Sequence, residues 1–108
     1  MEVNVMPLTL QEAQLVSWKI FRKINDQLDP SRGKTINTFV MVTDILEEAG
    51  EAAGIVKGLE GLKSPGEPKT REMLARELSD LLYAVFVLAE HYGLNLEETF
   101  LEHVNEIL

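Results

Sequence analysis

Two groups of carboxylates stand at spacings that place their side chains on one side of a helix. The first group is Glu47, Glu48 and Glu51, and the second is Glu77 and Asp80, with 25 residues between them. Residues three apart lie one above the other on a helix, so Glu48 with Glu51 and Glu77 with Asp80 each form a pair of neighbouring oxygen donors. Two facing helices would let both pairs hold the same divalent cations.

Glu77 is expected on the apolar side of its own helix. At about 100° of rotation per residue, it falls inside the arc formed by Leu74, Leu78, Leu81, Val85 and Leu88. An ionised carboxylate among apolar neighbours is costly unless it is paired or bound to a metal. Arg76 points about 100° away, and the expected partner helix offers more acids than bases. A bound dication removes this conflict.

The available donor atoms favour a hard metal ion. The chain has no cysteine and two histidines, so the ligands are oxygens, which select Mg²⁺ first and Mn²⁺ second. A di-iron or di-manganese carboxylate bundle usually needs Glu-x-x-His on two helices. Here Leu88 and Phe100 stand three residues before His91 and His103. We therefore interpret both histidines as helix-end or surface residues.

The charge balance argues against binding to nucleic acid. The chain holds 18 acidic and 10 basic side chains, a net charge of −8, and all of the acidic excess lies after residue 43. Binding to a nucleic-acid backbone needs clustered lysine and arginine. An acidic protein binds a polyphosphate when dications stand between the two anions. The alternative to metal binding is that acids on a helix simply form a solvated face. We favour this interpretation for Glu97, Glu98, Glu102 and Glu106.

Length and composition indicate one soluble domain over residues 1–108. The chain is 45% hydrophobic and 26% charged, as in ordinary globular proteins. The absence of cysteine excludes disulfides and fits a reducing cytoplasm. The longest apolar run, Leu81 to Ala89, is nine residues, about half of what a membrane span needs, and no basic segment with an apolar core opens the chain. We expect a cytoplasmic protein that does not bind membranes.

Breaker residues and apolar spacing predict four helices. They run from about Leu10 to Leu28, from between Thr35 and Thr38 to about Lys57, from a Thr70 cap to about Tyr92, and from an Asn95 cap to the end of the chain. Thr9 and Glu12 have the spacing of a capping box, and Gly58, Gly61 and Gly93 can end helices. No segment alternates as a strand does. The prediction is an all-α bundle of four helices.

The second expected helix has one apolar face, whereas part of the third is apolar all round. The apolar arc of the second expected helix consists of Met41, Ile45, Ala49, Ala52 and Val56. The run from Leu81 to Ala89 is apolar all round its helix, which requires neighbours on more than one side. We therefore expect a homodimer at least.

The carboxylates and their surroundings resemble the MazG-like, all-α nucleotide pyrophosphohydrolases. This family includes all-α dUTPases and dCTPases and is related in fold to phosphoribosyl-ATP pyrophosphohydrolase. The resemblance rests on Glu-Glu-x-x-Glu within residues 46–53, Glu-x-x-Asp within residues 77–83, and the segment 88–98, and it extends from about Thr43 to the C-terminus. It implies the helical bundle of that family, assembled as a dimer or a dimer of dimers.

The resemblance also implies an activity and roles for the acids. The activity is Mg²⁺-dependent hydrolysis of a nucleoside triphosphate to the monophosphate and pyrophosphate. By motif position Glu48, Glu51, Glu77 and Asp80 would bind the metal, and Glu47 would orient or deprotonate the attacking water. Glu47 lies furthest from the apolar arc, so a surface role is its alternative.

Six further residues are candidates for binding the nucleotide. Lys57 resembles a family lysine near the metal, although it also suits the end of a helix. Arg32 and Lys34, before the second helix, are expected to reach the outer phosphates. Trp18 and Phe21 on the first helix would flank the base or pack in the core. Asn37 would contact the sugar or base edge, or cap the helix.

The resemblance leaves the substrate open. Many members continue past the fourth helix into a basic, phosphate-binding segment, whereas this sequence ends at Leu108 with Asn105 in the corresponding region. A nucleotide pool-control or house-cleaning pyrophosphatase is the first hypothesis. The alternatives are a non-catalytic helical dimerisation module and an enzyme like phosphoribosyl-ATP pyrophosphohydrolase.

Overall fold

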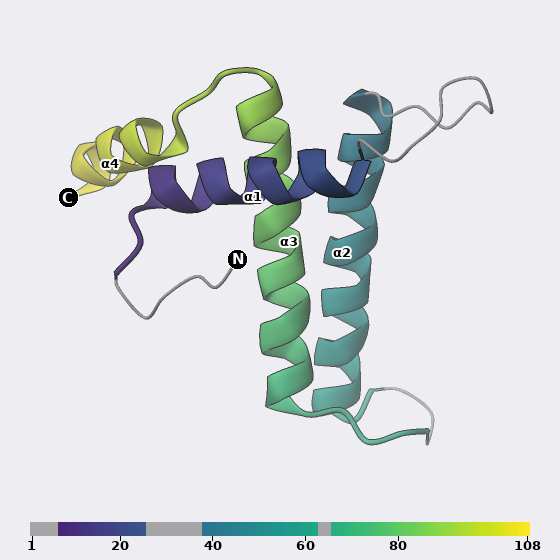
Figure 1. Ribbon diagram of the computed structural model, residues 1–108. Helices are drawn as coiled ribbons and strands as arrows, with labels where there is room; N and C mark the ends of the chain where they lie inside the picture. Colours follow the sequence, from purple (N-terminus) through teal and green to yellow (C-terminus); the bar gives the residue numbers. More distant parts are fainter. Residues whose placement is uncertain (1–6, 26–37, 63–65) are drawn as a thin grey trace.

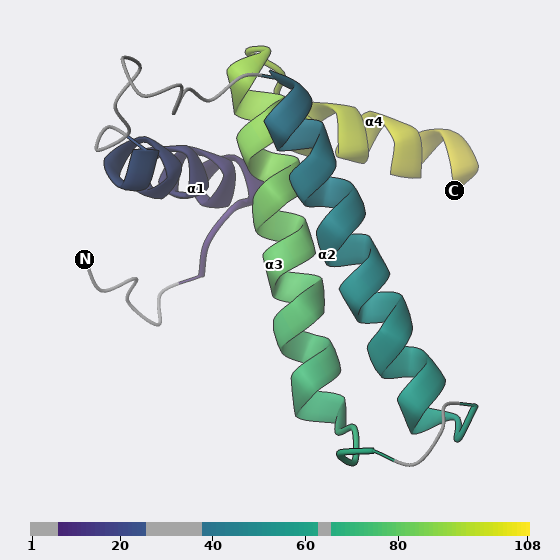
Figure 2. The same cartoon turned by 90° about the vertical axis from the view of Figure 1, so that its right-hand side faces the viewer.

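The computed structural model describes residues 7–25, 38–62 and 66–108. These residues form helices α1 (Leu10–Asn25), α2 (Thr38–Leu59), α3 (Arg71–His91) and α4 (Leu96–Ile107) and contain no strand. The prediction of an all-α chain with four helices is confirmed. Helices α2 and α3 run antiparallel along each other, α1 crosses this pair, and α4 projects away from it (Figures 1 and 2).

Local hydrogen bonds set the beginnings of three helices where the sequence predicts them. The amide of Thr9 donates to Oε1 of Glu12, and the amide of Glu12 donates to Oγ1 of Thr9, each at 3.1 Å. Oγ1 of Thr70 accepts from the amide of Met73 at 3.2 Å. Asn95 caps α4 in the same way. Each side chain satisfies an amide that lacks a partner within its helix.

Two of the three glycines expected to end helices, Gly61 and Gly93, stand just after helix ends, and the third does not. Gly61 and Gly93 have φ of +69° and +66°, a left-handed turn that glycine adopts without steric cost. Gly58 does not end α2 as expected, because the helix continues to Leu59. The predicted turn before the second helix, and the end of the first helix beyond Asn25, lie outside the described residues.

The contact between α2 and α3 follows a seam that advances by alternate steps of four and three residues. On α2 the seam is marked by the buried or half-buried residues Met41, Ile45, Glu48, Ala52 and Ile55. On α3 it is marked by Met73, Glu77, Ala84 and Val87, with the exposed Asp80 at the same spacing and close to Glu48 and Glu77. Two helices that run alongside each other meet at this average spacing of about 3.5 residues. A carboxylate of α2 and two of α3 therefore belong to the contact between the helices.

This seam corrects two predicted core positions. Val56 and Leu78, assigned to the apolar arcs, are 43% and 49% exposed, whereas Ile55 is buried. The predicted arcs used a free helix of 3.6 residues per turn, and over several turns that spacing drifts away from the line of contact with a partner helix. Glu48 lies on this line rather than beside it, and it is half-buried.

The centre of the core lies where α1 crosses the helix pair. Phe21, Met41 and Val87 form a buried cluster, against which Trp18 and Tyr83 pack. Trp18 stacks on Phe21 with 5.7 Å between ring centroids. Helix α4 contributes no buried residue. Within the described ranges, no helix is long and apolar enough to span a membrane.

A buried glutamine ties α1 to the connection between α3 and α4. Gln14 is 0% exposed, and its Nε2 donates to Oε2 of Glu90 at 2.7 Å and to the carbonyl of Leu94 at 2.6 Å. Its Oε1 accepts a longer hydrogen bond of 3.4 Å from the amide of Leu96. The side chain thus uses both ends of its amide to fix the turn that carries α4.

Replacing Gln14 with alanine is expected to destabilise the protein. Loss of these bonds leaves the polar groups of the turn without partners, at a cost of about 1–3 kcal/mol in the free energy of unfolding. Urea denaturation monitored by circular dichroism measures this quantity. Lys19→Ala, a change at an exposed position of α1, is the control and should have little effect. Equal unfolding midpoints for the two variants would contradict the assignment of Gln14 as a structural tie.

Candidate metal centre

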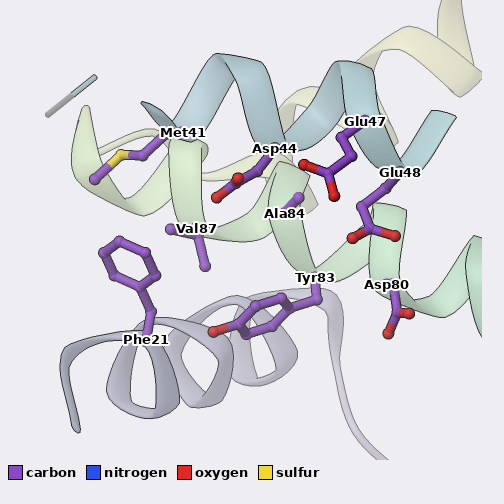
Figure 3. Close-up of a pocket in the computed structure, with 9 residues that line it drawn as sticks. All are labelled: Phe21, Met41, Asp44, Glu47, Glu48, Asp80, Tyr83, Ala84 and Val87. Atoms are coloured by element: carbon purple, nitrogen blue, oxygen red, sulfur yellow. The ribbon is translucent and has the colours of Figure 1, made fainter. Parts of the chain in front are cut away.

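Five carboxylates from α2 and α3 converge into two overlapping groups. In each group one oxygen from every member lies within 4.8 Å of the others, and the groups are Glu47, Glu48, Glu51 and Glu48, Glu77, Asp80. Glu48 belongs to both. Figure 3 shows the carboxyl group of Glu48 pointing from α2 towards Asp80 on α3, and the carboxyl group of Glu47 beside Ala84. The antiparallel helix pair therefore brings together all five acids that the two sequence motifs supplied.

Two of these carboxylates have a buried oxygen that needs a partner. Oε2 of Glu48 and Oε2 of Glu77 are buried and accept no hydrogen bond from the residues that the structure describes. A buried oxygen without a donor costs free energy, more so when it carries charge. The donor set is all oxygen, and it includes exposed carboxylates of Glu51 and Asp80 that can complete a coordination shell. The residues present therefore fit a hard divalent cation.

The close approach of the acids raises their affinity for protons. Burial, followed by the charges of Glu51 and Asp80 and by interaction with Glu77, raises the pKa of Glu48 from its ordinary 4.5 to about 7. Hydrogen bonding with Glu77 and the charge of Glu77 raise the pKa of Glu51. The site thus favours protonation or a bound cation at neutral pH, because repulsion opposes full ionisation.

A cavity of about 380 Å³ opens on the α1 side of the acids. One part of its wall is acidic and consists of Asp44, Glu47, Glu48 and Asp80. The rest is apolar or aromatic and consists of Phe21, Met41, Tyr83, Ala84 and Val87. Figure 3 shows the ring of Tyr83 between Phe21 and Asp80. This wall combines acids that could hold a metal with a surface that can pack against a flat apolar group.

A second cavity, of about 520 Å³, shares Glu47 with the first. It is lined by acids, by small or apolar residues of α2 and α3, and by one basic residue: Glu47, Glu51, Glu77, Gly50, Gly54, Ile55, Met73 and Lys69. The two cavities have different chemical surroundings, since the first has aromatic walls and the second has a lysine. A ligand could therefore reach the acid groups through either of two chemically different cavities.

The remaining candidates from the sequence lie in different places. Trp18 stacks on Phe21 in the core and is not part of either cavity wall, so the aromatic residue that α1 contributes to the first cavity is Phe21. Lys57 is exposed in the last turn of α2 and lines neither cavity. Arg32, Lys34 and Asn37 lie outside the described residues.

The histidines occupy the positions expected of them. His91 is the last residue of α3, and its Nε2 lies 3.0 Å from Oγ1 of Thr38. His103 lies on α4 beside an apolar groove. Among the described residues, neither histidine belongs to an acidic group with metal-binding geometry.

Sequence reasoning missed three residues of the cavity walls. Asp44 stands four residues before Glu48, and Tyr83 three residues after Asp80, so helical spacing could have found both. Burial and the charge of Asp44 raise the pKa of Tyr83. Lys69 precedes α3 in a loop, where no periodic signal indicates which way a side chain points.

Comparisons with known proteins agree with this geometry. The uncharacterized protein YvdC of Bacillus subtilis (strain 168) is 31% identical over 75 residues, which cover 64% of this chain and 71% of that protein. No solved structure matches the chain. The family model of the MazG nucleotide pyrophosphohydrolase domain matches residues 38–107, the region of α2, α3 and α4 that contains all five acids. The chain belongs to the MazG nucleotide pyrophosphohydrolase family.

Proposed function

We propose that this protein is a Mg²⁺-dependent pyrophosphohydrolase that cleaves a nucleoside or deoxynucleoside triphosphate to the monophosphate and pyrophosphate. The observation that carries the proposal is the pair of acid groups that share Glu48, with a buried, unpartnered oxygen on Glu48 and on Glu77. Membership of the MazG family supports a nucleotide substrate and a metal-dependent hydrolysis.

The acids divide between metal binding and activation of water. Glu48, Glu51, Glu77 and Asp80 would hold the metal, which supplies electrophilic stabilisation of the phosphates and of the leaving pyrophosphate. Mg²⁺ is the first choice and Mn²⁺ a substitute, because both prefer oxygen ligands. Glu47 is exposed and lines both cavities, so its carboxylate is available to orient a water molecule and to accept its proton as the bond between the α- and β-phosphates breaks.

The nucleoside is proposed to occupy the cavity on the α1 side. Phe21, Met41 and Val87 offer apolar contact for a base, and Tyr83 offers an aromatic ring with a hydroxyl. Trp18 would act through Phe21, on which it stacks. Phosphate contacts from Lys57, Arg32 and Lys34, and a sugar or base contact from Asn37, stay predictions from the sequence.

Several broader expectations also stay proposals. Residues 1–108 are proposed to act as one domain, in a cytoplasmic protein whose lack of cysteine suits reducing conditions. The net charge of −8 argues against a nucleic-acid partner. We further propose a dimer or a dimer of dimers, because apolar side chains of two regions are exposed in one chain.

One exposed apolar region is a groove of about 470 Å³ between α1, α3 and α4, whose lining includes Leu82, Val85 and Phe100. Phe100 is 60% exposed there. The other is a stripe along α2, formed by Phe39, Val42 and Leu46 at helical spacing, with exposures of 79%, 41% and 68%. Surfaces of this kind are typical of interfaces between subunits.

The activity is tested by assaying pyrophosphate release from a panel of nucleoside and deoxynucleoside triphosphates with MgCl₂. The wild-type protein should hydrolyse at least one nucleotide, and EDTA should abolish the reaction. Glu77→Gln should remove nearly all activity, because it takes a charged ligand from the centre. Glu47→Gln should lower kcat by about 10²–10⁴ and leave metal binding largely intact.

Glu106→Gln, a change at an exposed acid on α4, is the matched control and should keep the wild-type rate. A protein that hydrolyses no nucleotide in the panel, and whose melting temperature ignores Mg²⁺, would instead support a non-catalytic helical module.

The raised pKa of Glu48 predicts how stability depends on pH. The folded, metal-free protein binds this proton between about pH 4.5 and 7, where the unfolded chain has released it. The melting temperature of the metal-free protein should therefore fall as pH rises through this window. MgCl₂ should raise the melting temperature more at pH 8 than at pH 5, because protons compete with the cation.

Differential scanning fluorimetry in EDTA and in MgCl₂ measures both effects. Glu48→Gln should flatten the pH dependence and reduce the Mg²⁺ shift, whereas Glu106→Gln should change neither. A Mg²⁺ shift of equal size at both pH values would contradict the role of Glu48.

The assembly is tested by sedimentation velocity. The wild-type protein should sediment as a dimer or tetramer, and Phe100→Asp should yield smaller species, because it introduces a charge into the apolar groove. Phe39→Asp tests the stripe on α2 in the same way. The wild-type protein should be measured over a wide range of concentrations. If it stays monomeric even at the highest soluble concentration, the proposal is refuted.

A further inference from the structure

The side chain of Lys69, the lysine of the second cavity, packs against α2 at Gly58. A Cβ atom at Gly58 would collide with Cγ and Cβ of Lys69, so the side chain of Lys69 lies directly against the backbone of α2. Gly58 stands inside the last turns of a helix, where glycine is ordinarily unfavourable. The close approach of Lys69 is a specific physical reason for glycine at this position.

This contact places Lys69 in the wall of a cavity that it shares with three of the acids. Among the described residues that line the two cavities beside the acids, Lys69 is the only basic one. Its cavity also includes Glu51 and Glu77, one from each of the two acid groups, and Glu47. Lys69 itself is half-buried, so its aliphatic stem is covered while the cavity remains open to a ligand.

The two cavities differ in chemistry, and this difference indicates in which orientation a nucleotide would bind. The cavity on the α1 side has an apolar and aromatic wall, which suits a nucleoside. The cavity of Lys69 has no aromatic residue in its wall, and its lysine suits an anion such as a phosphate. Glu47 lines both, so the scissile bond would lie between them.

We propose that Lys69, positioned by Gly58, binds the pyrophosphate end of the nucleotide, so that the substrate extends from the Phe21 and Tyr83 cavity across the acids to Lys69. This inference rests on the proposed function and adds to it a phosphate-binding residue and an orientation. It assigns Lys69 to the substrate and not to neutralisation of the carboxylates.

Isothermal titration calorimetry with inorganic pyrophosphate in MgCl₂ tests the proposal without needing turnover. Lys69→Ala should weaken pyrophosphate binding by about tenfold or more, because a charge-assisted contact is lost. Its affinity for Mg²⁺ alone should stay equal or rise, since a cation has been removed from beside the acids. Lys69→Arg should restore most of the pyrophosphate affinity. Lys19→Ala, at an exposed position outside both cavity walls, is the control.

Gly58→Ala tests the positioning without removing the charge. Alanine suits a helix better than glycine does, so the fold should be retained while the new methyl group turns Lys69 away. The variant should weaken pyrophosphate binding in the same sense as Lys69→Ala, and combining the two changes should add little further loss.

The outcomes separate this inference from the proposed function. Pyrophosphate binding that depends on Lys69, in a protein that hydrolyses no nucleotide, would support the binding site and overturn the activity. Nucleotide hydrolysis with pyrophosphate affinity indifferent to Lys69→Ala would overturn the binding site and leave the activity. Loss of Mg²⁺ affinity in parallel with pyrophosphate affinity, or no pyrophosphate binding by the wild-type protein, would also overturn it.

Discussion

The repulsion among carboxylates along the contact between α2 and α3 is the constraint on which the rest of the structure depends. Antiparallel packing requires the two helices to meet along one line, and Glu48, Glu77 and Asp80 belong to that line. An apolar seam would hold the pair together more simply. The acids there raise the pKa of Glu48 and leave oxygens without donors, so this part of the contact is unfavourable until a proton or a cation occupies it.

Apolar residues at both ends of the contact between α2 and α3 offset the repulsion among the acids in its middle. Met41 and Val87 at one end of the seam pack with Phe21 of α1, and Ala52 and Ile55 are buried towards the other. Apolar burial at both ends holds the helices in register, which fixes the spacing of the acids between them. The crossing helix α1 has a second effect, because it supplies Phe21 to the wall of the cavity beside the acids, where Tyr83 of α3 is the other aromatic residue (Figures 1 and 3).

The cavities on the two sides of the acids give a single helix pair two chemically different surfaces, which is the basis of the proposed orientation of the nucleotide. One cavity borders the core, where α1 adds apolar surface, and the other borders the loop before α3, where Lys69 lies against Gly58. Their chemistry thus follows from position along the helix pair. Helix α4, which contributes no buried residue, contributes nothing to either wall, and Phe100 on it lines the exposed apolar groove.

The sequence by itself determined the four helices, most of their ends and the convergence of the five acids, because caps, breakers and helical spacing are local properties. It did not determine the line of contact, so Val56 and Leu78, which the helical spacing places on the apolar arcs, are exposed in one chain. Only the tertiary structure decided that Phe21 lines the cavity beside the acids while Trp18 stacks on it outside the wall, and that Lys69 shares a cavity wall with acids where Lys57 does not. The physical reason is that a partner helix imposes its own repeat on the buried face, and a loop side chain is directed by the surface it packs against.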